Sequence, residues 1–145
     1  MAGDRLLETV ARIREIAGPY ATHVTKLSNF IESLERFLDS LDAKIDIEVF
    51  EPESQERVPL RLAFERGPIG WRFFIGTDPE HDIAQLTQAS LEYKIRAAPL
   101  LAELLAKLLK AYEDRLATIQ KNTTNLTTLM EKFTPAPRKE ANEDE

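Results

Sequence analysis

Residues 6–41 read LLETVARIREIAGPYATHVTKLSNFIESLERFLDSL. Apolar side chains recur there at alternating spacings of four and three residues, at Leu6, Val10, Ile13, Ala17, Tyr20, Val24, Leu27, Ile31, Leu34, Leu38 and Leu41. This spacing is the a and d pattern of a coiled-coil helix. Ile16, Phe30 and Phe37 add a flanking row that broadens the apolar stripe. Because the frame is unchanged across Gly18-Pro19, we expect one helix that bends there rather than two helices.

A second stretch repeats the same pattern. Its a and d positions are Leu91, Ile95, Ala98, Ala102, Leu105, Leu109, Tyr112, Leu116, Ile119, Thr123, Leu126, Met130 and Phe133. Its first half also carries Leu100, Leu101, Leu104 and Leu108, so that half is apolar nearly all round. A helix needs such a surface only where it is covered on more than one side. Its second half lacks the extra leucines, and we expect it to have one partner and much solvent.

Between these two stretches the apolar period changes from 3.5 to two residues, which is typical of half-buried strands. The alternating apolar positions are Ile45, Ile47 and Val49, then Val58, Leu60, Leu62 and Phe64, then Trp71, Phe73 and Ile75. A polar turn separates the first two runs, and Gly67-Pro68-Ile69-Gly70 separates the last two. Since short turns join antiparallel strands, we expect a three-stranded antiparallel meander.

These patterns together predict an α+β protein of elongated shape. Two long coiled-coil-like helices flank the three-stranded antiparallel β-meander, in the order α-β-β-β-α. We expect residues 1–133 to form a single domain and residues 134–145 to form a disordered charged tail. The apolar face of the sheet is expected to pack on residues 100–109 and on the end of the first helix, including Phe30 and Phe37.

Composition excludes several classes of function. The chain has no cysteine, which rules out disulfides, thiolate metal sites and cysteine nucleophiles. A net charge of −6 argues against a general nucleic-acid binder, because such affinity comes mostly from neutralising phosphates. No signal-like or membrane-spanning apolar run is present, so we expect a cytoplasmic protein without membrane contact.

No stretch of the sequence carries a recognised catalytic or phosphate-binding motif. We therefore expect a protein that is not an enzyme, with no catalytic residue, no cofactor and no bound metal. The segment Asp78-Pro79-Glu80-His81-Asp82 groups carboxylates beside a histidine. We interpret it as a polar connection opened by an Asp-Pro turn rather than as a metal site, because no second histidine stands at ligand spacing.

Strand alternation places two phenylalanines on the face of the sheet that should point away from the helices. We predict a partner interface on this outer face, made of Phe50, Arg61, Ala63, Arg72 and Phe74. Aromatic residues at the centre and arginines at the edge are typical of interface cores. The alternative is that a bulge, a twist or a one-residue change of register turns one of the rings inward.

The expected element order is similar to that of prefoldin-type chaperones and of certain small bacterial nucleoid proteins, although element order alone does not carry function. Our first hypothesis is a non-enzymatic oligomeric scaffold or adaptor, a homodimer that also binds another protein through its coiled-coil helices and sheet face. An alternative is an acidic inhibitor or immunity-like protein that neutralises a basic partner with the acidic middle of the chain. A nucleoid-type DNA-binding dimer is a third hypothesis, and the acidic charge counts against it.

Overall fold

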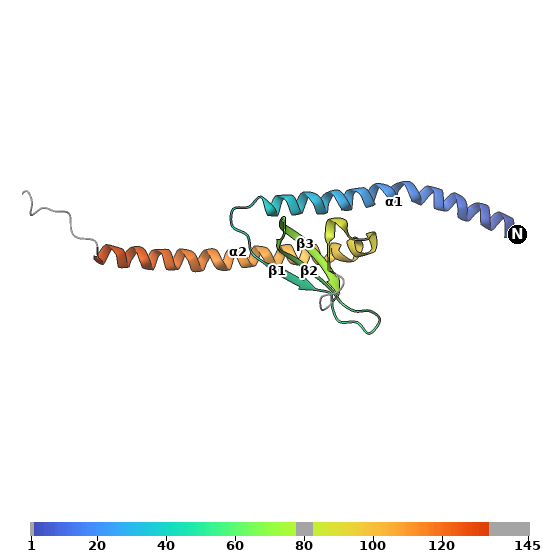
Figure 1. Cartoon of the computed structure of the whole chain (residues 1–145). Helices are drawn as coiled ribbons and strands as arrows, with labels where there is room; N and C mark the ends of the chain where they lie inside the picture. The colour runs from blue at the N-terminus through green and yellow to red at the C-terminus, as the bar shows by residue number, and fades with distance from the viewer. Residues whose placement is uncertain (1, 78–82, 134–145) are drawn as a thin grey trace, which may run out of the picture. The chain divides into compact units, whose positions relative to one another are not determined.

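The computed structural model describes residues 2–77 and 83–133 (Figure 1). Its elements are the helices α1 (Ala2–Asp39) and α2 (Leu91–Phe133), the short 3-10 helix η1 (Leu86–Gln88), and the strands β1 (Ile47–Phe50), β2 (Leu60–Gly67), β3 (Gly70–Thr77) and β4 (Ala84–Gln85). The predicted α+β class is confirmed.

The chain divides into two compact units, residues 1–108 and residues 109–145. The first unit holds α1, the sheet and the first half of α2, and the second holds the rest of α2. The predicted tail, residues 134–145, lies outside the described residues. A single domain over residues 1–133 stays a prediction.

The sheet is antiparallel in the order β1-β2-β3-β4, so the expected count of three strands was wrong by one. The fourth strand, β4, has only two residues, and a period of two cannot be recognised over so short a stretch. Strands β2 and β3 meet in a hairpin in which Gly67 pairs with Gly70. Neither Pro68 nor Ile69 has a positive φ, so the two-residue loop is not a primed turn, and Gly70 directly after it takes a φ of +128° that favours glycine.

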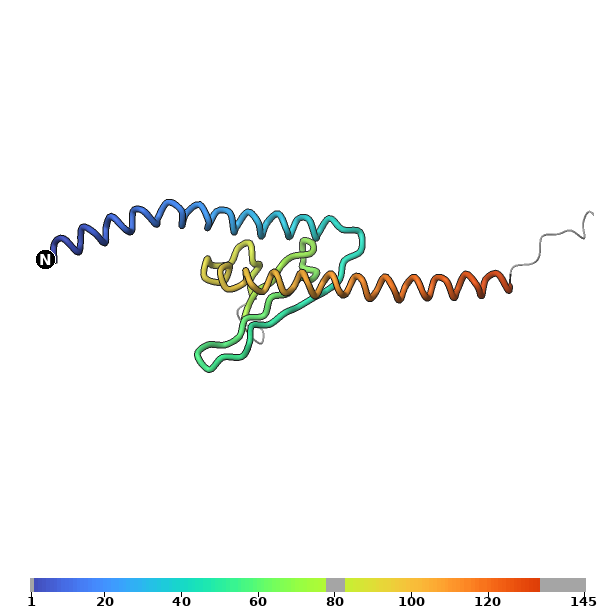
Figure 2. Tube along the Cα trace, turned by 180° about the vertical axis from the view of Figure 1, so that it is seen from behind, coloured from blue at the N-terminus to red at the C-terminus, as the bar shows by residue number. Residues whose placement is uncertain are grey.

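Helix α2 covers one face of the sheet. Its first half passes behind the strands in Figure 1 and in front of them in Figure 2, which shows the chain from the other side. The strand register lines up Val49, Leu62 and Ile75 in one row across that face. The extra leucines of α2 are buried against the sheet, as the sequence predicted: Leu100, Leu101, Leu104 and Leu108.

Helix α1 contributes Ile31 and Leu38 to the same core. Phe30 and Phe37 do not pack on the sheet, and the prediction that they would was wrong, since their exposed fractions are 55% and 59%. The buried side of α1 is the line of Ile31, Glu35 and Leu38, spaced four and three residues apart. The phenylalanines precede Ile31 and Leu38 by one residue, and a step of one residue turns a helix by about 100°.

Helix α1 continues through Gly18 and Pro19 without interruption and changes direction along its N-terminal half (Figures 1 and 2). Proline removes one backbone hydrogen bond and crowds the preceding turn, which is a common cause of such a bend. The prediction of one bent helix rather than two helices agrees with this structure.

Leu104 should be one of the residues on which the stability of the first unit depends. Replacing it with alanine (Leu104→Ala) removes buried methyl groups from a fully buried site, and should lower the free energy of unfolding by about 2–5 kcal/mol. The neighbouring Glu103 is exposed, so Glu103→Ala should change it by less than about 0.5 kcal/mol. Urea unfolding of the two variants measures both values, and equal effects would contradict the core described above.

Candidate partner-binding surfaces

Four of the five predicted interface residues lie together on the outer face of the sheet. Glu48, Ala63 and Phe74 form one row across β1, β2 and β3, and Phe50 and Arg61 stand in the next row. These positions alternate with the buried residues that face α2, so they belong to the opposite face. No helix of the described residues lies on this face in Figure 1.

Phe50, Arg61 and Phe74 line a hollow of about 190 Å³ on this face. The Phe50 side chain is 51% exposed, Phe74 is half-buried, and Ala63 is fully buried beneath its neighbours. A Cβ atom at Gly67 would come within 2.8 Å of Cζ of Phe74. The glycine therefore leaves room for the Phe74 ring, which lies over the hairpin end of β2.

Arg61 is already paired within the sheet. Its guanidinium donates hydrogen bonds to the carboxylates of Glu48 and, at 3.2 Å, of Glu65. Burial lowers the pKa of Arg61, but the two carboxylates outweigh burial and raise the pKa overall. The hollow is therefore bordered by an arginine that is already paired with two carboxylates rather than by a free cation.

Arg72 lies away from this hollow, at the edge of the sheet beside α1. Its Nη1 donates a hydrogen bond of 3.2 Å to Oδ2 of Asp39. Its Nε lies 3.7 Å from Oε1 of Glu35. The structure therefore groups Arg72 with two carboxylates of α1 and not with Phe50 and Phe74.

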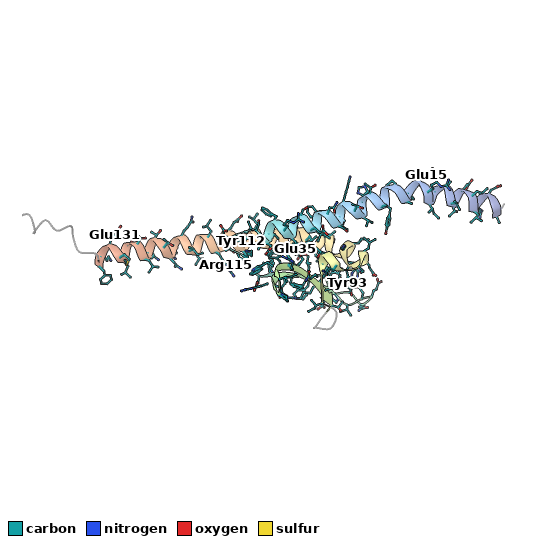
Figure 3. All side chains as sticks on the ribbon, turned by 45° about the horizontal axis from the view of Figure 1, so that its top comes forward. Glu15, Glu35, Tyr93, Tyr112, Arg115 and Glu131 are labelled. Carbon is teal, nitrogen blue, oxygen red and sulfur yellow. The ribbon has the colours of Figure 1, made fainter. Side chains whose placement is uncertain are left out.

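These two carboxylates also bind the backbone of β3. Oε2 of Glu35 accepts a hydrogen bond of 2.8 Å from the N–H of Phe73, and Oδ1 of Asp39 accepts one of 3.0 Å from the N–H of Trp71. Strand β4 pairs only with Phe74 and Ile75, so it leaves this part of the β3 edge open. Figure 3 shows Glu35 on the part of α1 that runs beside the sheet. The two side chains thus satisfy N–H groups that no strand satisfies.

The two carboxylates differ in their electrostatics. Burial of Glu35, whose exposed fraction is 7%, raises its pKa above the ordinary value of 4.5, although the Phe73 N–H and Arg72 oppose the shift. The hydrogen bond from the Trp71 N–H lowers the pKa of Asp39 below 3.8, and Arg72 adds to that effect. Among the described residues that are charged or polar, Glu35 is the buried one.

A signal for this contact is present in the sequence. Glu35 and Asp39 are like charges four residues apart on one helix, an arrangement that destabilises an isolated helix by a few tenths of a kcal/mol. Such a pair indicates that something outside the helix compensates both charges. The sequence does not show that the compensating groups are two backbone N–H groups and Arg72, because those come from a strand more than thirty residues away.

A third carboxylate, that of Glu51, joins α2 to the sheet. It accepts hydrogen bonds from Arg96 of α2 and, at 2.9 Å, from the N–H of Leu60. Burial raises the pKa of Glu51, but the hydrogen bonds from Arg96 and Leu60 outweigh burial and lower it overall. At the β1 edge, Nζ of Lys107 donates to the carbonyl oxygen of Glu48 at 2.8 Å. Sequence reasoning missed these contacts.

Both helices carry exposed apolar seams. We use α1 seam for Leu6, Val10, Ile13, Ala17, Tyr20, Val24 and Leu27, and α2 seam for Leu109, Tyr112, Leu116, Ile119, Thr123, Leu126 and Met130. In the α1 seam the large side chains from Leu6 to Tyr20 are exposed by 44–65%. In the α2 seam the exposed fractions of the large aliphatic side chains run from 56% at Leu116 to 64% at Met130, whereas Tyr112 is half-buried. Figure 3 labels Arg115 and Glu131 on residues 109–133 of α2, the part of the helix that carries the α2 seam.

No group of three or more histidine, aspartate or glutamate side chains in the described part of the chain is placed to hold a metal ion. The segment Asp78–Asp82, considered above as a metal site, lies outside the described residues. Within the described ranges, no helix has the length and apolarity that crossing a membrane requires. Comparison with known proteins found no matching family model, no similar curated protein and no similar solved structure.

The hydrogen bond and ion pair of Glu35 should contribute more to the free energy of unfolding than an exposed glutamate on the same helix does. Glu35→Ala removes the acceptor of the Phe73 N–H and the carboxylate beside Nε of Arg72 at a buried site. It should therefore lower the free energy of unfolding by about 2–4 kcal/mol. Glu32→Ala, one turn earlier on an exposed site, should change it by less than about 0.5 kcal/mol. Urea unfolding at neutral pH compares them, and a small loss for Glu35→Ala would show that the edge contact is dispensable.

The opposite pKa shifts of the two carboxylates predict opposite pH trends. Because the pKa of Asp39 is lowered on folding, its charge stabilises the protein above pH 3.8, and this contribution is lost as the pH falls through the lowered pKa. Because the pKa of Glu35 is raised on folding, its contribution is fully present below pH 4.5 and is lost as the pH rises through the raised pKa.

Asparagine and glutamine keep an acceptor oxygen but remove the titration, so they isolate these contributions. The stability difference between the wild type and Asp39→Asn should grow as the pH rises from about 3 to about 7, whereas the difference from Glu35→Gln should shrink. Urea midpoints measured across this range test both. The same trend in the two variants would contradict the assigned environments.

Proposed function

We propose that this protein is a non-enzymatic scaffold or adaptor that self-associates through the seams of its long helices and binds another protein on the outer face of its sheet. The observation that carries the proposal is the exposure of the α1 and α2 seams. Monomeric soluble proteins rarely expose contiguous apolar patches larger than a few hundred Å². Each seam presents several large aliphatic or aromatic side chains on one face of a helix.

The regular spacing of the seams supports a helical partner. Scattered exposed leucines are ordinary on protein surfaces, but a strict four-and-three repeat matches the periodicity of a neighbouring helix. Residues 2–23 of α1 and 113–133 of α2 are all exposed. Helices without tertiary packing are only marginally stable in water, since most helical stability in proteins comes from burial of one face.

The outer face of the sheet is the second surface of this proposal. Phe50 and Phe74 give the hollow apolar walls, and the Arg61 cluster gives it an edge of hydrogen-bond donors and acceptors. A pocket that combines aromatic anchors with polar groups at its edge is suited to a side chain of a protein partner. This surface shares no residue with the helix seams, so a scaffold could bind its partner through residues that self-association does not use.

The test of self-association is the mass in solution. The chain has a mass of 16.5 kDa, and light scattering at tens of micromolar should give twice that value or a higher multiple. The double variant Leu116→Gln, Ile119→Gln places two polar side chains in the α2 seam and should return the mass to that of one chain. Glutamine is chosen because its helix propensity is close to that of leucine.

The matched control is the double variant Ala117→Gln, Thr124→Gln. It introduces the same side chains into the same helix at exposed positions outside the seam, and it should keep the wild-type mass. A wild-type protein that scatters as a monomer would overturn the proposal. Equal dissociation of both double variants would show that the seam is not the surface involved.

A further inference from the structure

Helix α2 is stabilised differently along its two halves. The side chains that its first half buries in the core are Ala97, Leu100, Leu101, Leu104 and Leu108. From residue 113 to the end of the helix at Phe133, every residue is exposed. This second part buries no side chain within the described residues. Its helical form must therefore come from local helix propensity or from burial in an assembly.

Local helix propensity is low in one stretch of this second part. Residues 122–128 read Asn-Thr-Thr-Asn-Leu-Thr-Thr. Threonine loses side-chain freedom against the preceding turn of a helix, and asparagine forms hydrogen bonds with nearby backbone groups that compete with the helix. Residues 122–130 contain no charged side chain, so ion pairs between residues i and i+4 of this stretch cannot compensate.

An elongation estimate shows where α2 should end when its seam is free. A good helix former extends an existing helix by a factor of about 1–1.6 per residue, and threonine or asparagine lowers that factor roughly two- to threefold. The factor for each of these six residues is then below one. A helix that continues past Thr128 should have about a tenth of the population of one that ends near Lys121.

Burial of the α2 seam reverses this balance. Leu126 and Met130 belong to the seam, and their exposed fractions are 60% and 64%. Removing that much apolar surface from water favours the helical form by about fivefold or more for each side chain. The two side chains together outweigh the low propensity of residues 122–128. The same residues are therefore helical when the seam is covered and not helical when it is free.

We propose that residues 122–133 are a conditional segment, which is helical when the α2 seam is buried in an assembly and unwinds in a single free chain. This inference rests on the proposed self-association and adds that assembly is coupled to local folding. Part of the free energy of association is then used to order the segment. Assembly therefore responds to changes of helix propensity at residues that lie outside the seam.

Amide hydrogen exchange in the full chain tests this coupling. In the wild type at tens of micromolar, amides of the conditional segment should exchange at least tenfold more slowly than in an unfolded peptide of the same sequence. In the double variant Leu116→Gln, Ile119→Gln they should exchange at close to the unfolded rate. Amides of residues 97–108, where α2 packs on the sheet, should stay protected in both proteins and serve as the internal reference.

Three substitutions outside the seam separate helix propensity from burial. Thr124→Ala, Asn125→Ala and Thr128→Ala, added to that double variant, raise the propensity at exposed positions. They should slow exchange of the conditional segment about tenfold without restoring the mass of the oligomer. The matched control is Thr124→Asn, Asn125→Thr, Thr128→Asn at the same positions. Threonine and asparagine have similar propensities, so the control should change the exchange rate by less than about twofold.

The outcomes separate this inference from the proposed function. Rapid exchange of the conditional segment in a wild-type oligomer overturns the inference and leaves self-association standing. Slow exchange in the double variant at the mass of one chain also overturns the inference alone, and so does an equal effect of the alanine variant and its control. A wild-type protein with the mass of one chain by light scattering overturns both the inference and the proposed function.

Discussion

The contact on which the first unit depends is the pair of carboxylates that α1 places against the edge of β3. Four residues along a helix advance about 6 Å, and two residues along a strand advance about 6.6–6.8 Å. Glu35 and Asp39 therefore match the spacing of the N–H groups of Phe73 and Trp71. A helix shifted by one residue would lose both hydrogen bonds and bury a carboxylate without a partner. This contact fixes the position of α1 along the sheet more sharply than apolar packing can.

The same logic, with the charges reversed, holds α2. Its Lys107 donates to a backbone carbonyl of β1 and its Arg96 donates to the half-buried Glu51. Helix α1 thus offers acceptors to the N–H groups of one sheet edge, and α2 offers a donor to a carbonyl at the other edge. Sheet edges with unpaired backbone N–H and C=O groups can form hydrogen bonds with a further strand. Side chains that occupy these groups leave fewer free backbone groups at these edges for a further strand.

Periodicity alone predicted both helices, three of the four strands and the leucine side of α2, because burial of a repeating face leaves a repeating pattern. It did not predict which side of α1 is buried. The a, d and g positions of α1 form one broad apolar stripe, and Phe30 is as apolar as Ile31, so only the strand contacts of Glu35 decide between the two sides. It also grouped Arg72 with Phe50 and Phe74 by alternation, whereas Asp39 and Glu35 hold its guanidinium at the sheet edge.

The two apolar faces of α2 explain why a complete core and an exposed apolar repeat occur on one helix. Leu100, Leu101, Leu104 and Leu108 satisfy the sheet, and they lie outside the a and d positions that continue the heptad repeat into residues 109–133. The core is therefore built from these four leucines and does not use the a and d positions of residues 109–133. A strict four-and-three repeat kept over a length that the core does not contact has the periodicity to which a facing helix would pack. An exposed helix that lacked such a partner would be stabilised equally well by polar residues at those positions.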